Sequence, residues 1–331
     1  MANRTVWRTT ASPWIPLLMA VAFGLTSVAP ASGQARKSGR KRGSKAPSTR
    51  VSFNTDDGVL LSAVYFPALL ETGPSGEPDP DAGKSVAPVI LIHDWGSRSS
   101  ELYPLARFLQ QTKRIAVIVP DLRGHGQSNR QLFGGVEKTI DHEKMKPADI
   151  MKAFLDIQAT KRFLLEKNND KEVNIEMLTV IGVGFGSAIA LNWAAFDWSA
   201  PVLRTRKQGH DVKALILLSP QLTRRGASAR TAMKHPALRS TIAVQILSGK
   251  DSPNHKDAAK IYRSLHRAKE GRTPPRIVLV EFDTKLEGAR LLSSPLGRDV
   301  GNHMTRFITA HIFKKAPQLP WQARQFKKRG G

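Results

Sequence analysis

The chain of 331 residues contains no cysteine. It therefore has no disulfide, no thiol nucleophile and no cysteine-ligated zinc or iron–sulfur site. Its nine histidines include no pair with metal-ligand spacing such as H-E-x-x-H. We therefore expect neither a metal ion nor another cofactor. The absence of cysteine leaves the compartment open, because a large core needs no covalent cross-link.

Acidic residues are missing from two stretches near the ends of the chain. Residues 36–50 carry seven Lys or Arg and residues 314–331 carry six, without one Asp or Glu. These stretches supply much of the formal net charge of +24. We interpret them as a disordered basic linker (36–50) and a basic C-terminal tail (314–331), with Trp321 and Phe326 among the charges of the tail. They predict adhesion to an anionic envelope polymer or lipid, and not specific nucleic-acid recognition.

The N-terminal apolar run is too short to span a membrane. It covers residues 14–29, whereas a spanning helix needs roughly 20 residues. Arg4 and Arg8 precede the run, and the small residues Ala31 and Ala35 follow it. This pattern predicts a signal peptide over residues 1–35 and export to the periplasm or the medium. A membrane anchor is the alternative, which the basic block after the run favours.

Apolar strand-like runs alternate with amphipathic stretches between residues 51 and 313. We expect strands at 51–55, 59–66, 88–93, 115–120, 177–182, 214–219, 243–248 and 277–282. We expect helices at 102–111, 148–167, 187–198, 256–269 and 302–313. This alternation predicts one α/β domain over 51–313, with about eight strands in a mostly parallel sheet and helices on both faces. The segments 127–147 and 220–240 are candidates for a small lid, and no insertion is long enough for a large cap domain.

A glycine-rich segment, Gly182-Val183-Gly184-Phe185-Gly186, follows one of these strands and opens a helix. This is the context of the nucleophile elbow, G-x-S-x-G, but Gly184 stands where the serine is expected. A dinucleotide-binding loop needs G-x-G-x-x-G, and Ser187 replaces its third glycine. A phosphate-binding P-loop needs a Gly-Lys-Ser/Thr ending, which is absent. A glycine-rich turn without function is the remaining alternative.

Three further motifs follow other strands of the pattern. They are His93-Asp94-Trp95-Gly96 after 88–93, a segment from Asp121 to Ser128 (DLRGHGQS, with Arg123 and His125) after 115–120, and Gly249-Lys250-Asp251 after 243–248. In this order the motifs resemble the α/β-hydrolase superfamily, most closely the serine aminopeptidase and dienelactone hydrolase type. The resemblance covers about residues 51–313 and implies an α/β-hydrolase fold without a large cap domain.

The resemblance also implies a role for each matching position. Gly184 takes the place of the nucleophile, Asp251 that of the triad acid, and Glu287 that of the histidine. Asp94 replaces a glycine of the oxyanion loop. The amides of Trp95 and Phe185 are the expected oxyanion donors, which remain able to bind an anion or a carbonyl without the serine. Asp121 and Arg123 belong to the loop motifs, and His93 and His125 are expected to organise those loops.

Other residues are weaker candidates for chemistry. Ser187 lies in the first turn of a helix, and Ser219 and Ser248 end buried strands, so we expect structural roles for them. His303 is a candidate to enter the pocket. A covalent acyl-enzyme needs both a nucleophile and a base. We therefore interpret the chain as an exported, catalytically inactive protein with a binding or scaffold role and an unknown small-molecule ligand in the remnant pocket. The alternative is an active esterase or peptidase with a different catalytic arrangement.

Overall fold

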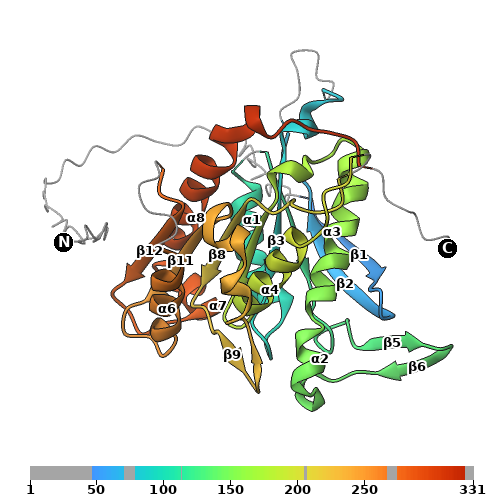
Figure 1. Cartoon of the computed structure of the whole chain (residues 1–331), viewed down its shortest axis with the longest axis horizontal. Coiled ribbons are helices and arrows are strands. Elements are labelled where there is room, and N and C mark those ends of the chain that lie inside the picture. The colour runs from blue at the N-terminus through green and yellow to red at the C-terminus, as the bar shows by residue number, and fades with distance from the viewer. Residues whose placement is uncertain (1–46, 71–78, 113, 205–206, 267–273, 325–331) are drawn as a thin grey trace, which may run out of the picture. The chain divides into compact units, whose positions relative to one another are not determined.

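A computed structural model of the chain describes residues 47–70, 79–112, 114–204, 207–266 and 274–324 (Figure 1). The predicted signal peptide, most of the predicted linker and residues 325–331 lie outside these ranges. Within the described ranges, no helix is both long and apolar enough to cross a lipid bilayer.

The domain is built on one ten-stranded sheet. Its strands lie in the order β12 (Ile277–Phe282), β11 (Ala243–Gly249), β8 (Ala214–Leu218), β7 (Thr179–Val183), β3 (Ala87–Ile92), β4 (Ile115–Pro120), β2 (Val59–Phe66), β5 (Arg130–Phe133) and β6 (Val136–Thr139). β1 (Thr49–Asn54) also pairs with β2. Neighbouring strands from β12 to β4 are parallel, and the remaining pairs are antiparallel. The predicted α/β-hydrolase fold with a mostly parallel sheet is confirmed.

Helices cover both faces of this sheet, as predicted (Figure 1). α3 (Phe154–Asn169), α4 (Gly186–Trp198) and α6 (His255–His266) pack on one face, and α1 (Tyr103–Gln110) and α8 (Gly297–His311) on the other. Successive residues of a strand point to opposite faces, so Ile90 joins the first layer and Leu91 the second. This double burial explains why the central strands are continuous apolar runs.

The two segments named as lid candidates form small hairpins. Part of 127–147 folds as β5 and β6, which extend the sheet beyond β2 and make it larger than the eight strands expected. Part of 220–240 forms the separate pair β9 (Thr223–Arg224) and β10 (Ala227–Ser228). Neither is a large cap domain, and none is evident in the described part of the chain.

Helix boundaries differ from the sequence prediction in two places. The helix expected at 148–167 is divided into α2 (Pro147–Met151) and α3. The last long helix, α8, begins at Gly297 rather than at residue 302, and the short α7 (Gly288–Ser293) precedes it. His303 therefore lies inside α8 and not at a helix start.

The segment predicted as a basic tail from residue 314 is part of the domain as far as Arg324, so that prediction was wrong over 314–324. After the 3₁₀ helix η6 (Phe313–Gln318), the chain runs from α8 to α3 (Figure 1). The indole Nε1 of Trp321 donates to the carbonyl oxygen of Asn168 (3.0 Å). Arg324 is only 4% exposed and forms ion pairs with Glu176 and Asp211. These carboxylates neutralise the guanidinium charge of Arg324, which has no acidic residue near it in the sequence of this segment.

Candidate functional site

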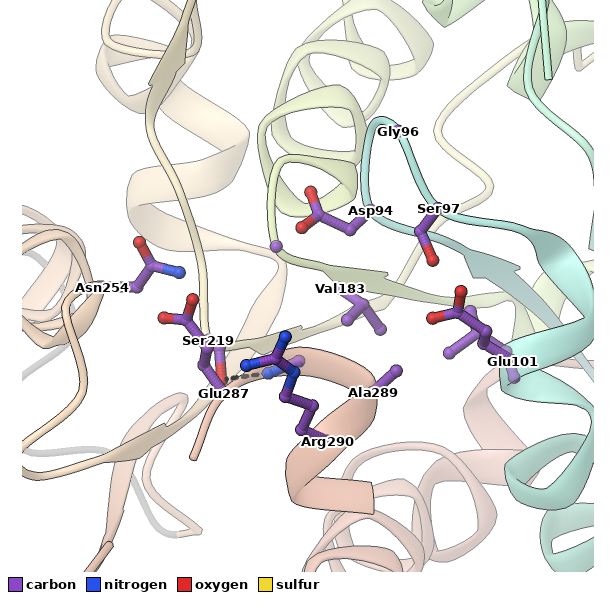
Figure 2. Close-up of a pocket in the computed structure, with 13 residues that line it drawn as sticks. Asp94, Gly96, Ser97, Glu101, Val183, Ser219, Asn254, Glu287, Ala289 and Arg290 are labelled. Atoms are coloured by element: carbon purple, nitrogen blue, oxygen red, sulfur yellow. Dashed lines mark hydrogen bonds between the residues drawn. The ribbon is translucent and has the colours of Figure 1, made fainter. Parts of the chain in front are cut away.

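The candidate site is a cavity of about 320 Å³ at the carboxyl ends of the central strands (Figure 2). Gly184 lines it at the sharp turn between β7 and α4, with a φ of +56°. Asp94 follows β3, Ser219 follows β8, and Glu287 precedes α7. Because parallel strands end at one edge of a sheet, residues far apart in the sequence meet here.

The Asp94 carboxyl group lies against the α-carbon of Gly184 and against the backbone N–H groups of Trp95 and Phe185. Its Oδ1 accepts hydrogen bonds from the backbone N–H groups of Trp95 (2.8 Å) and Phe185 (2.7 Å). These are the two donors expected to form an oxyanion hole. A Cβ atom on Gly184 would lie 2.2 Å from Asp94 Cγ, so the carboxylate also fills the space of a side chain at the elbow. In this structure the two amides are not free for a ligand's anion or carbonyl, contrary to the sequence interpretation.

The surroundings of Asp94 change the pKa of its carboxyl group. Burial raises the pKa of the Asp94 carboxyl above its usual value, and the negative charge of Glu287 adds to this effect. The hydrogen bonds from the Phe185 and Trp95 amides and the positive charge of Arg224 act in the opposite direction without cancelling the rise. Asp94 is therefore a partly buried acceptor that holds its proton at higher pH than an exposed aspartate.

Glu287 lies on the other side of the cavity, together with Arg290 (Figure 2). It immediately precedes α7, and the N–H of the next residue, Gly288, donates to Ser219 Oγ (2.9 Å). Glu287 Oε2 is buried and accepts no hydrogen bond from any described residue. The structure thus brings the predicted nucleophile and histidine positions, Gly184 and Glu287, to one cavity.

Asp251, the predicted acid position, is not brought to that cavity. Its side chain is exposed, and its backbone N–H donates to the carbonyl oxygen of Thr284 (3.2 Å). Asn254, further along the same loop, lines the cavity instead (Figure 2). A polar amide of this loop therefore lines the cavity together with Glu287, and the residue that the motif comparison selected does not.

His93 and His125 join loops and do not line the cavity. His93 Nε2 accepts from the N–H of Leu122 (3.0 Å), and its Nδ1 donates to the carbonyl oxygen of Asp94 (2.7 Å). His125 Nε2 accepts from the N–H of Gly96 (2.9 Å). Burial lowers the pKa of both rings, that of His125 to about 3. Both imidazoles are neutral at physiological pH and hold the oxyanion loop against the loop after β4.

Asp121 and Arg123 fix the loop after β4. Asp121 accepts hydrogen bonds from the backbone N–H groups of Ser99 (3.3 Å) and Gln127 (3.2 Å). Arg123 is buried and pairs with Asp57 (2.7 Å) and Asp156 (2.8 Å). The loop is thereby tied to the first hairpin turn and to α3.

Two of the serines considered as nucleophiles make only local bonds. Ser187 Oγ donates to the carbonyl oxygen of Gly182 (2.9 Å), and Ser248 Oγ to that of Gly249 (3.1 Å). Ser219 differs, because it lines the cavity and has a φ of +46°, which is uncommon for a residue with a side chain. The sequence showed only that Ser219 ends a strand.

His303 does not line the cavity; its backbone carbonyl accepts from Gln245 Nε2 (3.1 Å). Within the described ranges, no three His, Asp or Glu residues are arranged to hold a metal ion.

The comparison with protein families identifies the class of protein to which the chain belongs. A model described as the alpha/beta hydrolase family matches residues 89–328. This match covers more than half of the chain, and the chain belongs to the α/β-hydrolase family. No curated protein matches the chain.

Solved structures with a similar fold include several esterases. An esterase from Pyrococcus furiosus shares 14% identity, with a TM-score of 0.56 over 81% of this chain and 93% of that one. A fungal esterase from Rhizomucor miehei shares 12% identity, with a TM-score of 0.56 over 81% and 84%. An esterase from Pyrobaculum calidifontis also shares 12%, with a TM-score of 0.56 over 79% and 84%. At these identities the similarity shows the fold alone.

Proposed function

We propose that the chain is a degenerate α/β-hydrolase, related to the serine aminopeptidase and dienelactone hydrolase type, that binds a small ligand and forms no acyl-enzyme. One observation carries this proposal. The Asp94 carboxylate stands in the space of the missing nucleophile and accepts both amides that would stabilise an oxyanion.

Acyl transfer through a serine needs a nucleophile, a base and oxyanion donors. Gly184 supplies no nucleophile, and Glu287 stands in the place of the base. A substrate carbonyl oxygen directed at the Trp95 and Phe185 amides would meet the oxygens of Asp94 instead, and would gain no stabilisation as negative charge developed on it. The nucleophile and the free oxyanion donors are both lacking at this site, and a carboxylate stands in place of the histidine base; this favours binding over turnover.

The lining of the cavity favours a ligand that donates hydrogen bonds and carries positive charge. Asp94, Glu101 and Glu287 contribute carboxyl groups, against the single guanidinium group of Arg290. A buried acceptor without a donor, such as Glu287 Oε2, costs about 1–3 kcal/mol. An ammonium group beside Glu287 would remove that cost, so we propose a small primary amine as the ligand class.

Calorimetric titration of the purified protein with a panel of small primary amines and their carboxylate analogues tests this proposal. We expect at least one amine to bind, the carboxylates not to bind, and Glu287→Gln to weaken amine binding about tenfold. Glu137→Gln, which removes an exposed carboxylate on β6, is the matched control and should bind as the parent does. Turnover of simple esters or aminoacyl amides by the parent protein would contradict the proposal.

Ester hydrolysis at Ser219 is the second candidate, and the conformation of that residue favours it. A side chain held at φ +46° on the wall of a cavity resembles a presented nucleophile. Its Oγ already accepts a hydrogen bond from the N–H of Gly288. Other hydrogen-bond donors would have to stabilise the oxyanion, because Asp94 holds the amides of Trp95 and Phe185. Exposure to a serine-directed phosphonate separates the candidates. Labelling that disappears in Ser219→Ala supports the esterase, and an unlabelled protein supports binding.

Export and adhesion complete the proposed function. We propose that residues 1–35 direct export and that the block 36–50 holds the protein on anionic envelope polymers or lipids. Such attraction between exposed charges is screened over a Debye length of about 8 Å at physiological ionic strength. Deleting residues 36–46, which carry six of the seven basic residues and end before β1, should therefore remove most of the salt-sensitive binding to heparin. Equal binding by the shortened protein would show that the block is passive.

A further inference from the structure

The tip of the β5–β6 hairpin exposes three large apolar side chains. Leu132 is 60% exposed, Phe133 75% and Val136 68%. Gly134 and Gly135 connect them in a tight turn. Most apolar residues of this domain are buried, so a cluster of three at one tip indicates a surface that is covered in use.

The apolar character extends to both faces of the hairpin. Phe133 and Val136 are direct partners across the two strands and therefore point to the same face. Leu132 precedes Phe133 on the strand and points to the opposite face. A flat protein partner would cover one face only, whereas a hydrocarbon layer surrounds an inserted tip on both. The geometry favours lipid over a protein surface.

Charge around the base of the hairpin suits an anionic surface. Exposed basic residues flank the tip on both sides: Arg130, Lys138, Lys144 and Lys146. Three nearby carboxylates offset part of this charge: Glu137 and Asp141 are paired with Arg130 (3.7 Å) and Lys144 (4.0 Å), and Glu143 is exposed. The ammonium groups of Lys138 and Lys146 add positive charge beside the tip. The formal net charge of +24 attracts the whole chain to the same kind of surface.

We propose that the β5–β6 tip inserts into an anionic lipid bilayer surface. The hairpin follows the carboxyl end of β4, at the edge of the sheet where the cavity lies, and projects beside α2 (Figure 1). Insertion of the tip would therefore hold the edge of the domain that contains the cavity near the lipid. This interaction is independent of the proposed ligand and of the basic block 36–50.

The absence of cysteine permits a direct test with a single labelled site. Val136→Cys, carrying a polarity-sensitive fluorophore, is mixed with vesicles of phosphatidylglycerol and phosphatidylcholine. We expect a blue shift on binding, and quenching by lipids that carry a quencher in their acyl chains. Val202→Cys is the matched control, since Val202 is 83% exposed in the loop after α4 and is not near the hairpin in sequence. Its label should stay in water while the protein is bound.

A second variant separates insertion from simple charge attraction. The double substitution Phe133→Ser and Val136→Ser should weaken vesicle binding at least tenfold at 0.5 M salt, where the basic blocks contribute little. Circular dichroism confirms that the variant is folded. Unchanged binding of this variant, or a label at residue 136 that stays in water on bound vesicles, would overturn the proposal. A blue shift without vesicles would also overturn it, in favour of contact between copies of the chain.

Discussion

The Asp94 carboxyl group fills the space that a side chain on Gly184 would need, since a Cβ atom on Gly184 would lie 2.2 Å from Asp94 Cγ. Gly184 also has a φ of +56°, a conformation that glycine adopts without strain. Two separate physical reasons therefore favour glycine at the centre of this elbow. One is the backbone conformation of the turn, and the other is the Asp94 side chain, which fills the space that a Cβ atom would need.

We expect Gly184→Ser to destabilise the fold through both effects. The strained backbone costs about 1–3 kcal/mol, and displacing Asp94 from its two amides adds about 1–3 kcal/mol. Urea unfolding should show that the same substitution costs less in an Asp94→Gly background, where only the backbone strain remains. If Gly184→Ser costs the same free energy of unfolding in both backgrounds, the two residues do not compete for space.

The raised pKa of Asp94 predicts a pH-dependent contribution to stability. An acid whose folded-state pKa lies above its unfolded value binds more protons when folded, so stability falls as pH rises between the two values. Asp94→Asn removes this titration and leaves an oxygen acceptor for the amides of Trp95 and Phe185. The variant should gain stability relative to the parent as pH rises from the usual aspartate value of 3.8 through the folded pKa. Urea unfolding at several pH values measures this, and parallel profiles would contradict it.

The sequence was sufficient for the order of strands and helices because that signal is local. Each buried strand is a continuous apolar run, and each motif of the α/β-hydrolase pattern stands directly after one. The glycine at position 184, where the family pattern has a serine, was visible for the same reason. The replacement of the family's glycine by Asp94 was also visible in the sequence, but the hydrogen bonds that Asp94 accepts were not. Its placement on the Phe185 amide, 91 residues away, depends on space that Gly184 leaves open.

Long-range pairing accounts for features that the sequence did not show. Arg324 is basic within a basic stretch, yet its partners Glu176 and Asp211 lie 148 and 113 residues earlier. The segment 127–147 contains polar and glycine residues typical of a lid, but Arg130 pairs with Leu60 and adds a hairpin to the sheet. A charge run or a loop composition predicts exposure only when no distant partner is available, and sequence alone does not show that.

We expect Arg324→Ala to destabilise the domain strongly. Breaking a buried ion pair by removing one partner typically costs about 3–5 kcal/mol, because the carboxylates that remain are uncompensated. Lys207 would remain beside both carboxylates, Lys161 beside Asp211 and Lys213 beside Glu176, so we expect a loss at the lower end of that range. Thermal and urea unfolding measure the effect. Lys314→Ala is the control, because that side chain is exposed in the same segment and should change stability by less than about 0.5 kcal/mol. Similar losses in both variants would contradict the structural role of Arg324.

The hydrogen bonds from the Trp95 and Phe185 amides to Asp94 also predict which substitutions restore ester hydrolysis. Gly184→Ser with Glu287→His returns a nucleophile and a base, but we expect no activity from this pair of substitutions. The new serine would crowd Asp94 but not remove it, so the Asp94 carboxyl group would still stand beside the Trp95 and Phe185 amides and compete with the developing oxyanion for them. Losing one such donor in a working enzyme lowers kcat by about 10²–10³, so blocking both prevents measurable turnover.

Adding Asp94→Gly opens the two amides and removes the clash with the new serine. We expect this triple variant alone to hydrolyse an activated ester above background and to react with a serine-directed phosphonate. Its activity should stay modest, because Asp251 is exposed and Asn254 is the polar residue of that loop that lines the cavity. Asn254→Asp would then raise kcat further by orienting the new histidine. Activity in the double variant equal to that of the triple would show that Asp94 leaves the amides when a substrate is present.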